Sequence, residues 1–305
     1  MLIFFNKVII RIKNIILYKL RKVRRFILNV KINNFPKLLR ISSKPYISGD
    51  SFRKISNHIF DETQSFNPNN VNYGEVIFVK GDLLQLFFET LHPSIKNKYI
   101  LISHNSDFEI NESIIKYVDN KIIKYFAQNL NIPANEHITV LPIGLENRYY
   151  LNNGKLAHFK KNLNSKKNLP ILASFSNSNS ERSEILKLIE VNSLIIHEKF
   201  KNHKEYVKSM KKFKFNICPP GNGLDTHRVW ESLLLDTYPI FVRNTFTMNF
   251  EKLGLPALYL DNWSELNNLN QNILENCYKE LKFKSLNKKF VNLKYWTNEI
   301  KDSAV

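Results

Sequence analysis

The sequence predicts an α/β protein built from two parallel-sheet halves, and three observations support this. Short apolar runs alternate with helical patterns from residue 74 onward. The runs are continuously hydrophobic, which is typical of parallel strands buried on both faces. A polar and weakly patterned stretch, 153–169, separates two series of such runs. We therefore expect two Rossmann-like domains, the first over 45–165 and the second over 166–305.

The first series contains four short apolar runs that we interpret as strands: 75–80, 99–104, 121–126 and 137–142. A helical pattern over 82–91 connects the first two. The second series contains five such runs: 170–176, 193–197, 213–218, 238–243 and 257–260. Helical patterns alternate with these runs over 180–190, 203–211 and 225–236, and the region after the last run is helical to the C-terminus. This order of elements predicts two parallel sheets, because parallel neighbours need a crossover between them.

Ligands of such sheets bind beyond the carboxyl ends of the strands. The loops after Ile102, Val140, Phe175 and Ile217 are therefore the candidate positions for a site.

The 305 residues include 45 Lys and Arg against 27 Asp and Glu, a formal charge of +18. Residues 1–40 contain eleven of these basic residues and no acidic one, and apolar residues recur there at helical spacing. Charges interrupt the segment too often for a span of about 20 apolar residues, and it lacks the cleavage site of a secretory signal. We expect a basic amphipathic helix on an anionic membrane surface, and so a cytoplasmic, peripheral protein. The alternatives are a helix packed on the core and, third, a nucleic-acid-binding arm.

Several classes of protein are excluded or disfavoured by composition. Two cysteines, Cys218 and Cys277, rule out a disulfide framework and favour free thiols. The histidines form no H-x-x-x-H or H-E-x-x-H pair, so a helical zinc site has no support, and we expect no cofactor. Outside residues 1–40 no basic stripe is interleaved with aromatic residues, which argues against a nucleic-acid partner. The G-x-S-x-G element of serine hydrolases is absent from the sequence, so that class of enzyme has no support.

The segment 213–243 reads as a strand, a glycine-bearing turn, a helix start and another strand. Gly221 and Gly223, with Asn222 between them, allow positive φ and a close approach of the backbone to a ligand. Asp225 or Thr226 is placed to cap the following helix. Free N–H groups and the helix dipole at that end favour an anion.

Arg228 lies in the first turn of this helix, and its guanidinium matches a phosphate bidentately. Glu231 is one turn further on, where a carboxylate accepts hydrogen bonds from both hydroxyls of a ribose. Together these groups suit the diphosphate and ribose of a nucleotide, and His227, adjacent to Arg228, is within reach of such a diphosphate. After the strand 170–176, the hydroxyls of Ser174 and Ser176 suit a phosphate- or sugar-binding loop. The alternative is a surface ion pair between Arg228 and Glu231 that follows an ordinary turn.

The same stretch resembles the C-terminal signature of exostosin-type glycosyltransferases and their bacterial and viral relatives. The matching residues are CPPGNG at 218–223, DTHR at 225–228, WE at 230–231 and YPI at 238–240. Softer similarity is present in the first half: SHNSD at 103–107 and PIGLENR at 142–148. The chain departs from the family at Asp236-Thr237-Tyr238, where a small Gly-Cys-type turn is common.

The resemblance implies a GT-B fold, in which two Rossmann-like domains face each other across a cleft. It implies that Arg228 binds the diphosphate and Glu231 the ribose of a nucleotide-sugar, held mainly by the second domain. It further implies sugar transfer to a glycan or lipid-linked acceptor, inverting and without an essential metal, in surface polysaccharide or glycoconjugate synthesis.

An inverting transferase needs a base that takes the proton of the acceptor hydroxyl. His104 and Asp107 follow the strand 99–104, at the edge where an acceptor is expected, so both are candidates. The alternative is that 103–107 forms only a turn or a helix cap. The other histidines, His203 among them, are expected to be surface or packing residues, and Trp230 a core residue. Two rival functions remain: a non-catalytic nucleotide- or sugar-binding module, and a basic nucleic-acid-binding protein.

Overall fold

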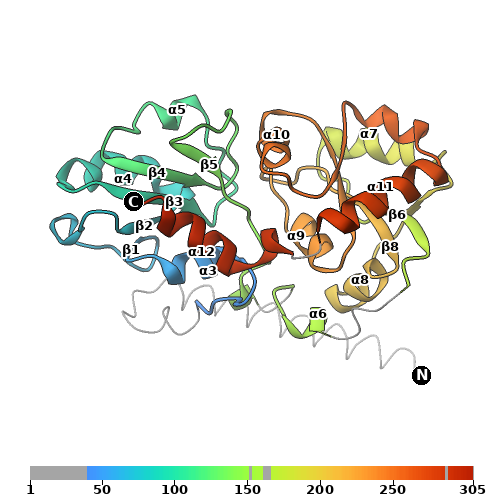
Figure 1. Cartoon of the computed structure of the whole chain (residues 1–305), viewed down its shortest axis with the longest axis horizontal. Coiled ribbons are helices and arrows are strands. Elements are labelled where there is room, and N and C mark those ends of the chain that lie inside the picture. Colours follow the sequence, from blue (N-terminus) through green and yellow to red (C-terminus); the bar gives the residue numbers. More distant parts are fainter. Residues whose placement is uncertain (1–39, 151–152, 161–165, 286–287, 305) are drawn as a thin grey trace, which may run out of the picture.

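The computed structural model describes residues 40–150, 153–160, 166–285 and 288–304. Two five-stranded sheets lie side by side along the long axis of the molecule (Figure 1). All strand pairs within both sheets are parallel. We call the part around the first sheet the first half and the part around the other the second half. The expected α/β class with two parallel sheets is confirmed.

The first sheet has the order β1-β2-β3-β4-β5. Its strands are β1 (His58–Phe60), β2 (Val76–Lys80), β3 (Tyr99–His104), β4 (Ile122–Ala127) and β5 (Ile138–Val140). Its helices are α3 (Gly49–Ile55), α4 (Leu84–Thr90) and α5 (Glu112–Ile115), with short 3-10 turns at Pro68–Asn70, Gly81–Leu83, His92–Ser94 and Arg148–Tyr150. Each strand therefore lies beside the strand that precedes it in the sequence, always on the same side, and the direction of winding does not reverse.

The second sheet has the order β10-β9-β8-β6-β7. Its strands are β6 (Leu169–Ala173), β7 (Ile195–His197), β8 (Phe213–Ile217), β9 (Tyr238–Val242) and β10 (Leu258–Leu260). Its helices are α7 (Ser180–Ile189), α8 (His203–Met210), α9 (His227–Leu234), α10 (Thr245–Lys252) and α11 (Gln271–Lys284), with a 3-10 turn at Trp263–Asn268. The winding direction reverses between β6 and β8, and such a switch point is where ligands bind in open parallel sheets.

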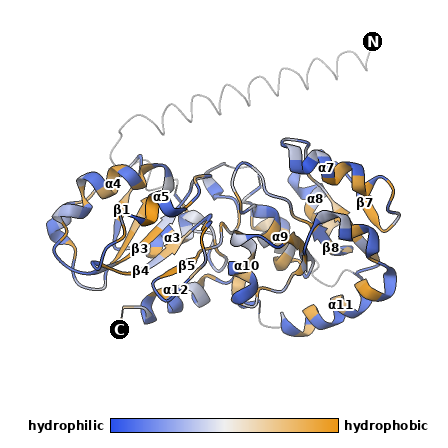
Figure 2. Cartoon of the chain, turned by 90° about the horizontal axis from the view of Figure 1, so that it is seen from above, coloured by the Kyte–Doolittle hydropathy of each residue, from blue (hydrophilic) through white to orange (hydrophobic). Residues whose placement is uncertain are grey.

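The predicted strands correspond to β2 to β10, because continuous apolar runs are the sequence form of strands buried on both faces. All six residues of β3 are buried. The sequence reading missed α3 and β1, which are short and carry little periodicity. In Figure 2 the outer helices α7 and α11 alternate hydrophilic and hydrophobic residues, as expected for helices with one face on a core.

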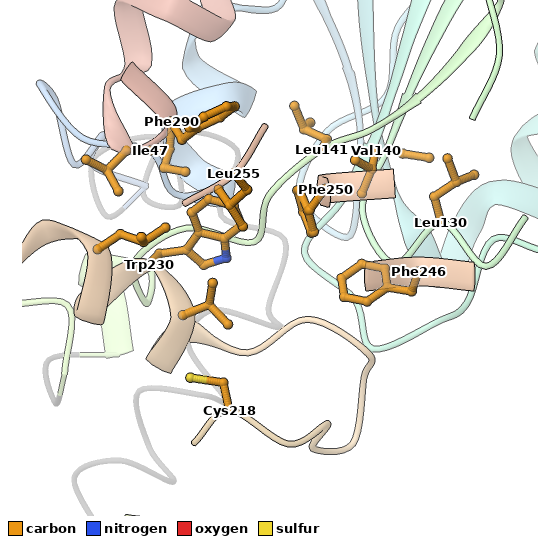
Figure 3. Packing of buried hydrophobic residues seen from close by; sticks show 14 of the residues in the cluster. Ile47, Leu130, Val140, Leu141, Cys218, Trp230, Phe246, Phe250, Leu255 and Phe290 are labelled. Atoms are coloured by element: carbon orange, nitrogen blue, oxygen red, sulfur yellow. The ribbon is translucent and has the colours of Figure 1, made fainter. Parts of the chain in front are cut away.

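The two halves share a buried apolar contact. Trp230 of α9 is fully buried, as expected, and its ring packs edge-on against Phe250 of α10 at 5.3 Å. Figure 3 shows these rings near Val140, the last residue of β5, and Leu141, which follows it. The side chain of Asn249 joins the halves by polar contacts: its Oδ1 accepts from Ala134 N at 2.8 Å, and its amide donates to two first-half carbonyls.

The C-terminal helix α12 (Leu293–Asp302) returns to the first half, where it lies beside α3 (Figure 1). The 3-10 turn Lys289–Val291 precedes α12, and the chain here is hydrogen-bonded to the segment near Pro45. Leu293 N donates to Pro45 O at 2.8 Å, and Ile47 N donates to Val291 O at 3.2 Å. The C-terminal helix thus packs on the first half, against α3. The predicted boundaries, 45–165 and 166–305, assign this helix to the second domain.

The expected membrane helix at 1–40 lies outside the described residues except for Arg40. Arg40 is buried and ion-paired to Asp50 and Glu62, so it belongs to the first half rather than to a membrane-facing surface. Within the described ranges, no helix is long and apolar enough to cross a bilayer.

Candidate functional site

Two neighbouring cavities lie at the carboxyl edges of the sheets. The second-half cavity has a volume of about 540 Å³, and its walls include Ser174, which follows β6, and the turn that follows β8. It therefore lies at the switch point between these strands. The first-half cavity has a volume of about 320 Å³. Asp107, Ile143 and His227 line both cavities and form the wall that they share.

The turn after β8 brings the two halves close together. Gly221 and Gly223 both line the second-half cavity, but neither has a positive φ, so that part of the expectation is wrong, and the close approach to a ligand stays a prediction. Gly223 is required by proximity, since a Cβ there would lie 2.8 Å from Asn129 Nδ2 and 3.3 Å from Asp107 Cα. Asn222 is exposed at the cavity wall. The glycine at 223 thus permits first-half residues to reach the second-half cavity.

Asp225 binds protein groups instead of facing a ligand freely. Its carboxylate accepts hydrogen bonds from Ile143 N at 2.7 Å and from Trp230 Nε1 at 2.9 Å. Its backbone N–H donates to Asn129 Oδ1 at 2.9 Å. Burial raises the pKa of this carboxyl to about 7, and the hydrogen bonds oppose that rise. Asp225 therefore connects the halves at the wall of the second-half cavity, which the sequence reading did not anticipate.

The N-terminus of α9 opens on the second-half cavity. Thr226 is the N-cap residue, but its side chain makes no capping hydrogen bond, and its buried Oγ1 has no partner in the described structure. At the other end of α9, Lys167 and Lys288 donate to the carbonyls of Leu235 and Leu234. The carbonyl end of the helix is therefore neutralised by the protein, and the amide end is left available for an anion.

Two guanidinium groups lie in the same cavity without carboxylate partners. Arg228 Nε donates to Ser174 O at 3.0 Å. Arg182, in the first turn of α7, is buried and donates only to neutral oxygens, those of Pro220, Ser176 and Ser178. Neither group forms an ion pair among the described residues, and burial followed by the charge of Arg228 lowers the pKa of Arg182. A buried cation next to a second, half-buried cation is costly unless an anion compensates them.

Glu231 lines the second-half cavity, and its partner is His203 rather than Arg228. His203 Nε2 lies 2.8 Å from Glu231 Oε1, and both side chains are 6% exposed. His158 Nδ1 in turn lies 2.9 Å from His203 Nδ1. The alternative of a surface pair between Arg228 and Glu231 is therefore wrong. His203 is a buried residue that packs against the rings of Phe159 and Tyr206, as expected of a packing residue, and it also binds Glu231. His203 orients the carboxylate proposed to bind a ribose.

The two candidate bases differ in accessibility. His104 is 1% exposed, its Nδ1 accepts from Asn105 N at 2.7 Å, and its Nε2 donates to Pro142 O at 3.0 Å. Burial lowers the pKa of His104 to about 4, so the imidazole is neutral and has no free nitrogen. Asp107 is exposed on the shared wall. The geometry therefore disfavours His104 as a base and is compatible with Asp107.

His227 also lies on the shared wall, at the first position of α9. Its Nδ1 donates to the carbonyl of Gly144 at 2.7 Å, which leaves Nε2 available to a ligand. Gly144 has φ +68°, and a Cβ there would lie 2.5 Å from Ile47 O, so this position does require glycine. Ser176 does not line either cavity, although its carbonyl accepts from Arg182.

Arg182 is the main residue that sequence reasoning missed. A signal was present, because Arg182 and Arg228 both lie in the first turn of a helix that follows a predicted strand. The relevant strands, β6 and β8, are neighbours only in the folded sheet. Phe200, Asn202 and Tyr206 also line the second-half cavity and had no motif to reveal them.

The first-half cavity contains a chain of ion pairs. Arg40 is paired with Asp50 at 3.2 Å and with Glu62. Lys80 is paired with Glu62 at 3.6 Å and with Asp82 at 3.1 Å. In contrast to the second-half cavity, both cations here are neutralised by carboxylates.

No group of three or more His, Cys, Asp and Glu side chains that would hold a metal occurs among the described residues. Independence from metal and cofactor stays a prediction. Cys218 and Cys277 are free, as expected, and burial raises the pKa of Cys218 to about 12.

No protein-family model and no curated protein matches the chain. Among solved structures, it is similar to an alpha,alpha-trehalose-phosphate synthase (UDP-forming) from Burkholderia vietnamiensis, with 8% identity over 77% of this chain and 76% of that one, at a TM-score of 0.43. It is also similar to the synthase of the same name from Burkholderia xenovorans, in complex with glucose-6-phosphate, with 10% identity over 77% and 74% of the chains, at a TM-score of 0.40. Similarity at this level does not establish a shared activity, and the exostosin resemblance stays a prediction from the motif.

Proposed function

We propose that the protein is a glycosyltransferase of the GT-B type that transfers a sugar from a nucleotide-sugar to an acceptor hydroxyl. One observation carries the proposal: Arg182 and Arg228 face the second-half cavity without carboxylate partners, beside the N-terminus of α9. Two cations and a helix N-terminus together match the two adjacent charges of a diphosphate. The diphosphate of the donor would occupy this position.

The remaining walls of the second-half cavity supply the other contacts. Glu231, held by His203, would accept hydrogen bonds from the ribose hydroxyls. Phe200 and Tyr206 provide aromatic surface for the base of the nucleotide. Ser174, Asn222 and the glycines of the turn would approach the diphosphate by their backbone.

In the proposed reaction, the acceptor oxygen attacks the anomeric carbon, and the bond from that carbon to the diphosphate oxygen breaks. The electron pair leaves with the nucleoside diphosphate, whose developing charge Arg182 and Arg228 would stabilise. Asp107 would take the proton of the acceptor hydroxyl, since its exposed carboxylate lies on the wall shared by both cavities. Direct attack of this kind inverts the anomeric configuration.

The test is thermal shift of the full chain with a panel of nucleoside diphosphates and nucleotide-sugars. A ligand at 100 times its Kd should stabilise the protein by about 2.7 kcal/mol. Arg228→Ala and Arg182→Ala should each weaken binding by about 10- to 100-fold, because each removes charged hydrogen bonds of about 1.5–3 kcal/mol. Arg243→Ala is the matched control, since Arg243 is exposed and paired with Glu251 and Asp261.

The proposal fails if no nucleotide stabilises the folded wild type, or if the Arg243 variant loses as much affinity as the other two. Release of sugar from a bound nucleotide-sugar, with Asp107→Asn as the inactive comparison, then separates an enzyme from a non-catalytic nucleotide-binding module.

We further propose that the basic segment at the N-terminus brings the enzyme to an anionic membrane surface, at the cytoplasmic face. The support is the sequence alone: residues 1–40 contain eleven basic residues in a helical apolar pattern. Deletion of residues 2–39, which spares the buried Arg40, should abolish sedimentation with vesicles of anionic lipid. Retained sedimentation of the truncated protein would refute this part. Vesicles of neutral lipid are the control.

A further inference from the structure

The first-half cavity is lined by residues from the carboxyl ends of four strands. Glu62 follows β1, Lys80 and Asp82 lie at the end of β2, Asp107 follows β3, and Gln128 follows β4. A parallel sheet brings these strand ends to one edge, so the cavity is a product of the fold and not of a single loop.

The charges of this cavity do not suit an anion. Arg40 and Lys80 are the two cations of the cavity lining, and three carboxylates line the cavity with them: Glu62, Asp82 and Asp107. Asp50 is a further partner of Arg40 but is buried and does not line the cavity. Two positive and three negative lining groups give a formal local charge of −1, within a chain whose formal charge is +18. A phosphate in this cavity would meet no unpaired cation and would be repelled by Asp107.

Two acceptors of the cavity lining, on Gln128 and Asp107, lack a partner among the described residues, and so does one buried donor, Nε of Arg40. Gln128 is 3% exposed, and its Nε2 donates to Ser106 O at 2.8 Å, whereas its buried Oε1 has no partner in the described structure. Asp107 likewise has no hydrogen bond or ion pair from the described residues. A buried acceptor without a donor is costly, and a ligand hydroxyl would supply that donor. Ionised phosphate oxygens only accept, so they cannot satisfy these groups.

An aromatic wall completes the cavity. The rings of Tyr149 and Tyr150 lie with their centroids 4.1 Å apart, and the guanidinium of Arg40 lies 4.3 Å from the centroid of Tyr149. Tyr150 is 44% exposed at the opening. An aromatic face beside a few polar groups suits a molecule with an apolar C–H face and hydroxyls at its edge.

We infer that the first-half cavity binds an uncharged, hydroxyl-rich molecule, a neutral sugar unit, and discriminates against phosphorylated sugars. Its identification as the acceptor site rests on the proposed function, because the shared wall of Asp107 and His227 places its ligand next to the second-half cavity. The acceptor could be a free glycan or a sugar linked through phosphate to a carrier. In both cases the part that enters this cavity is then the neutral sugar end.

The test measures binding to the full chain by saturation-transfer NMR titration. The probes are methyl α-D-glucopyranoside, methyl β-D-galactopyranoside, methyl α-D-mannopyranoside and glucose 6-phosphate. At least one neutral glycoside should bind, and glucose 6-phosphate should bind at least about fivefold more weakly than that glycoside. Gln128→Leu should weaken the glycoside by about fivefold, the equivalent of one neutral hydrogen bond.

A second variant guards against misfolding. Tyr150→Ala alters an exposed side chain and should also weaken the glycoside several-fold. Asn267→Ala, on the far surface near Leu194, is the matched control and should change nothing. Equal or tighter binding of glucose 6-phosphate, no binding of any glycoside, or unchanged affinity in both cavity variants would each overturn the inference.

Nucleoside diphosphate binding is measured on the same samples. If the glycosides bind as expected while no nucleotide binds, the proposed function fails and the sugar site stands. If nucleotides bind and depend on Arg182 and Arg228 while no glycoside binds, the sugar site fails and the proposed function stands.

Discussion

The second-half cavity contains two guanidinium groups without carboxylate partners, whereas both cations of the first-half cavity are neutralised by carboxylates. Both cavities lie at the carboxyl edge of a parallel sheet, and both contain Arg together with acidic residues. A count of charged residues would not separate them. The ion pairs do separate them, because a cation without a carboxylate partner gains more from binding an anion than one that is already neutralised. The comparison teaches that the ion pairs of a cavity, rather than its composition, indicate the ligand.

The stability of the protein should be most sensitive to substitution at Gly144, which is next to Ile143 of the wall that the cavities share. Gly144→Ala should destabilise the protein by about 2–4 kcal/mol, because the new Cβ combines a left-handed φ with a backbone clash. That Cβ would lie 2.5 Å from Ile47 O. Urea unfolding measures the effect.

Gly254→Ala is the matched control for this prediction. Gly254 has φ +78°, but nothing lies within 4 Å of a Cβ there, so only the cost of the backbone conformation, about 1 kcal/mol, is expected. Equal losses of unfolding free energy in the two variants would mean that the chain is not tightly packed against Ile47 at Gly144.

The carboxyl of Asp225 should make stability depend on pH. Its folded-state pKa, about 7, lies above the ordinary value near 3.9. The folded carboxyl thus keeps its proton where the unfolded one has lost it. This contribution to stability is complete below about pH 4 and is lost as pH rises through 7, at most about 1.4 kcal/mol per unit.

The measurement for Asp225 is the free energy of unfolding from pH 4 to pH 8, in the wild type and in Asp225→Asn. The wild-type value should fall more steeply between pH 4 and 7 than that of the variant. Parallel profiles would show that the hydrogen bonds from Ile143 and Trp230 keep the carboxyl ionised in spite of its burial.

The smallest effect tests the comparison most directly. Glu62→Gln removes the carboxylate between Arg40 and Lys80, so the first-half cavity should come to resemble the other one. The affinity for glucose 6-phosphate should rise about fivefold, by NMR titration, because one repulsive charge is lost and two cations are partly freed. Glu280→Gln removes the same charge from a surface pair with Lys284 and should leave that affinity unchanged. An equal rise in both variants would assign the effect to overall charge.

Much of the fold and part of the site could be predicted from local patterns. The strands β2 to β10 correspond to continuous apolar runs, and the turn after β8 with the start of α9 was recognisable from glycines, a capping position and Arg228. These features depend on residues close together in the chain. Short elements such as β1 were missed, because three residues carry no period.

The partners of the site residues depended on contacts between distant segments. Glu231 meets His203, Asp225 meets Ile143, and Arg182 meets the turn that contains Pro220, across separations of 28, 82 and 38 residues. No spacing in the sequence encodes these meetings, because they follow from which strands become neighbours and how the two sheets face.

The sequence by itself determined the two parallel sheets and the helix start that carries Arg228, since hydrophobic periodicity and turn-forming residues act over a few positions of the chain. Only the tertiary structure decided that a second unpaired guanidinium joins Arg228 and that the cations of the neighbouring cavity are neutralised. Pairing is a property of distances between side chains, and those distances exist only once the chain has folded.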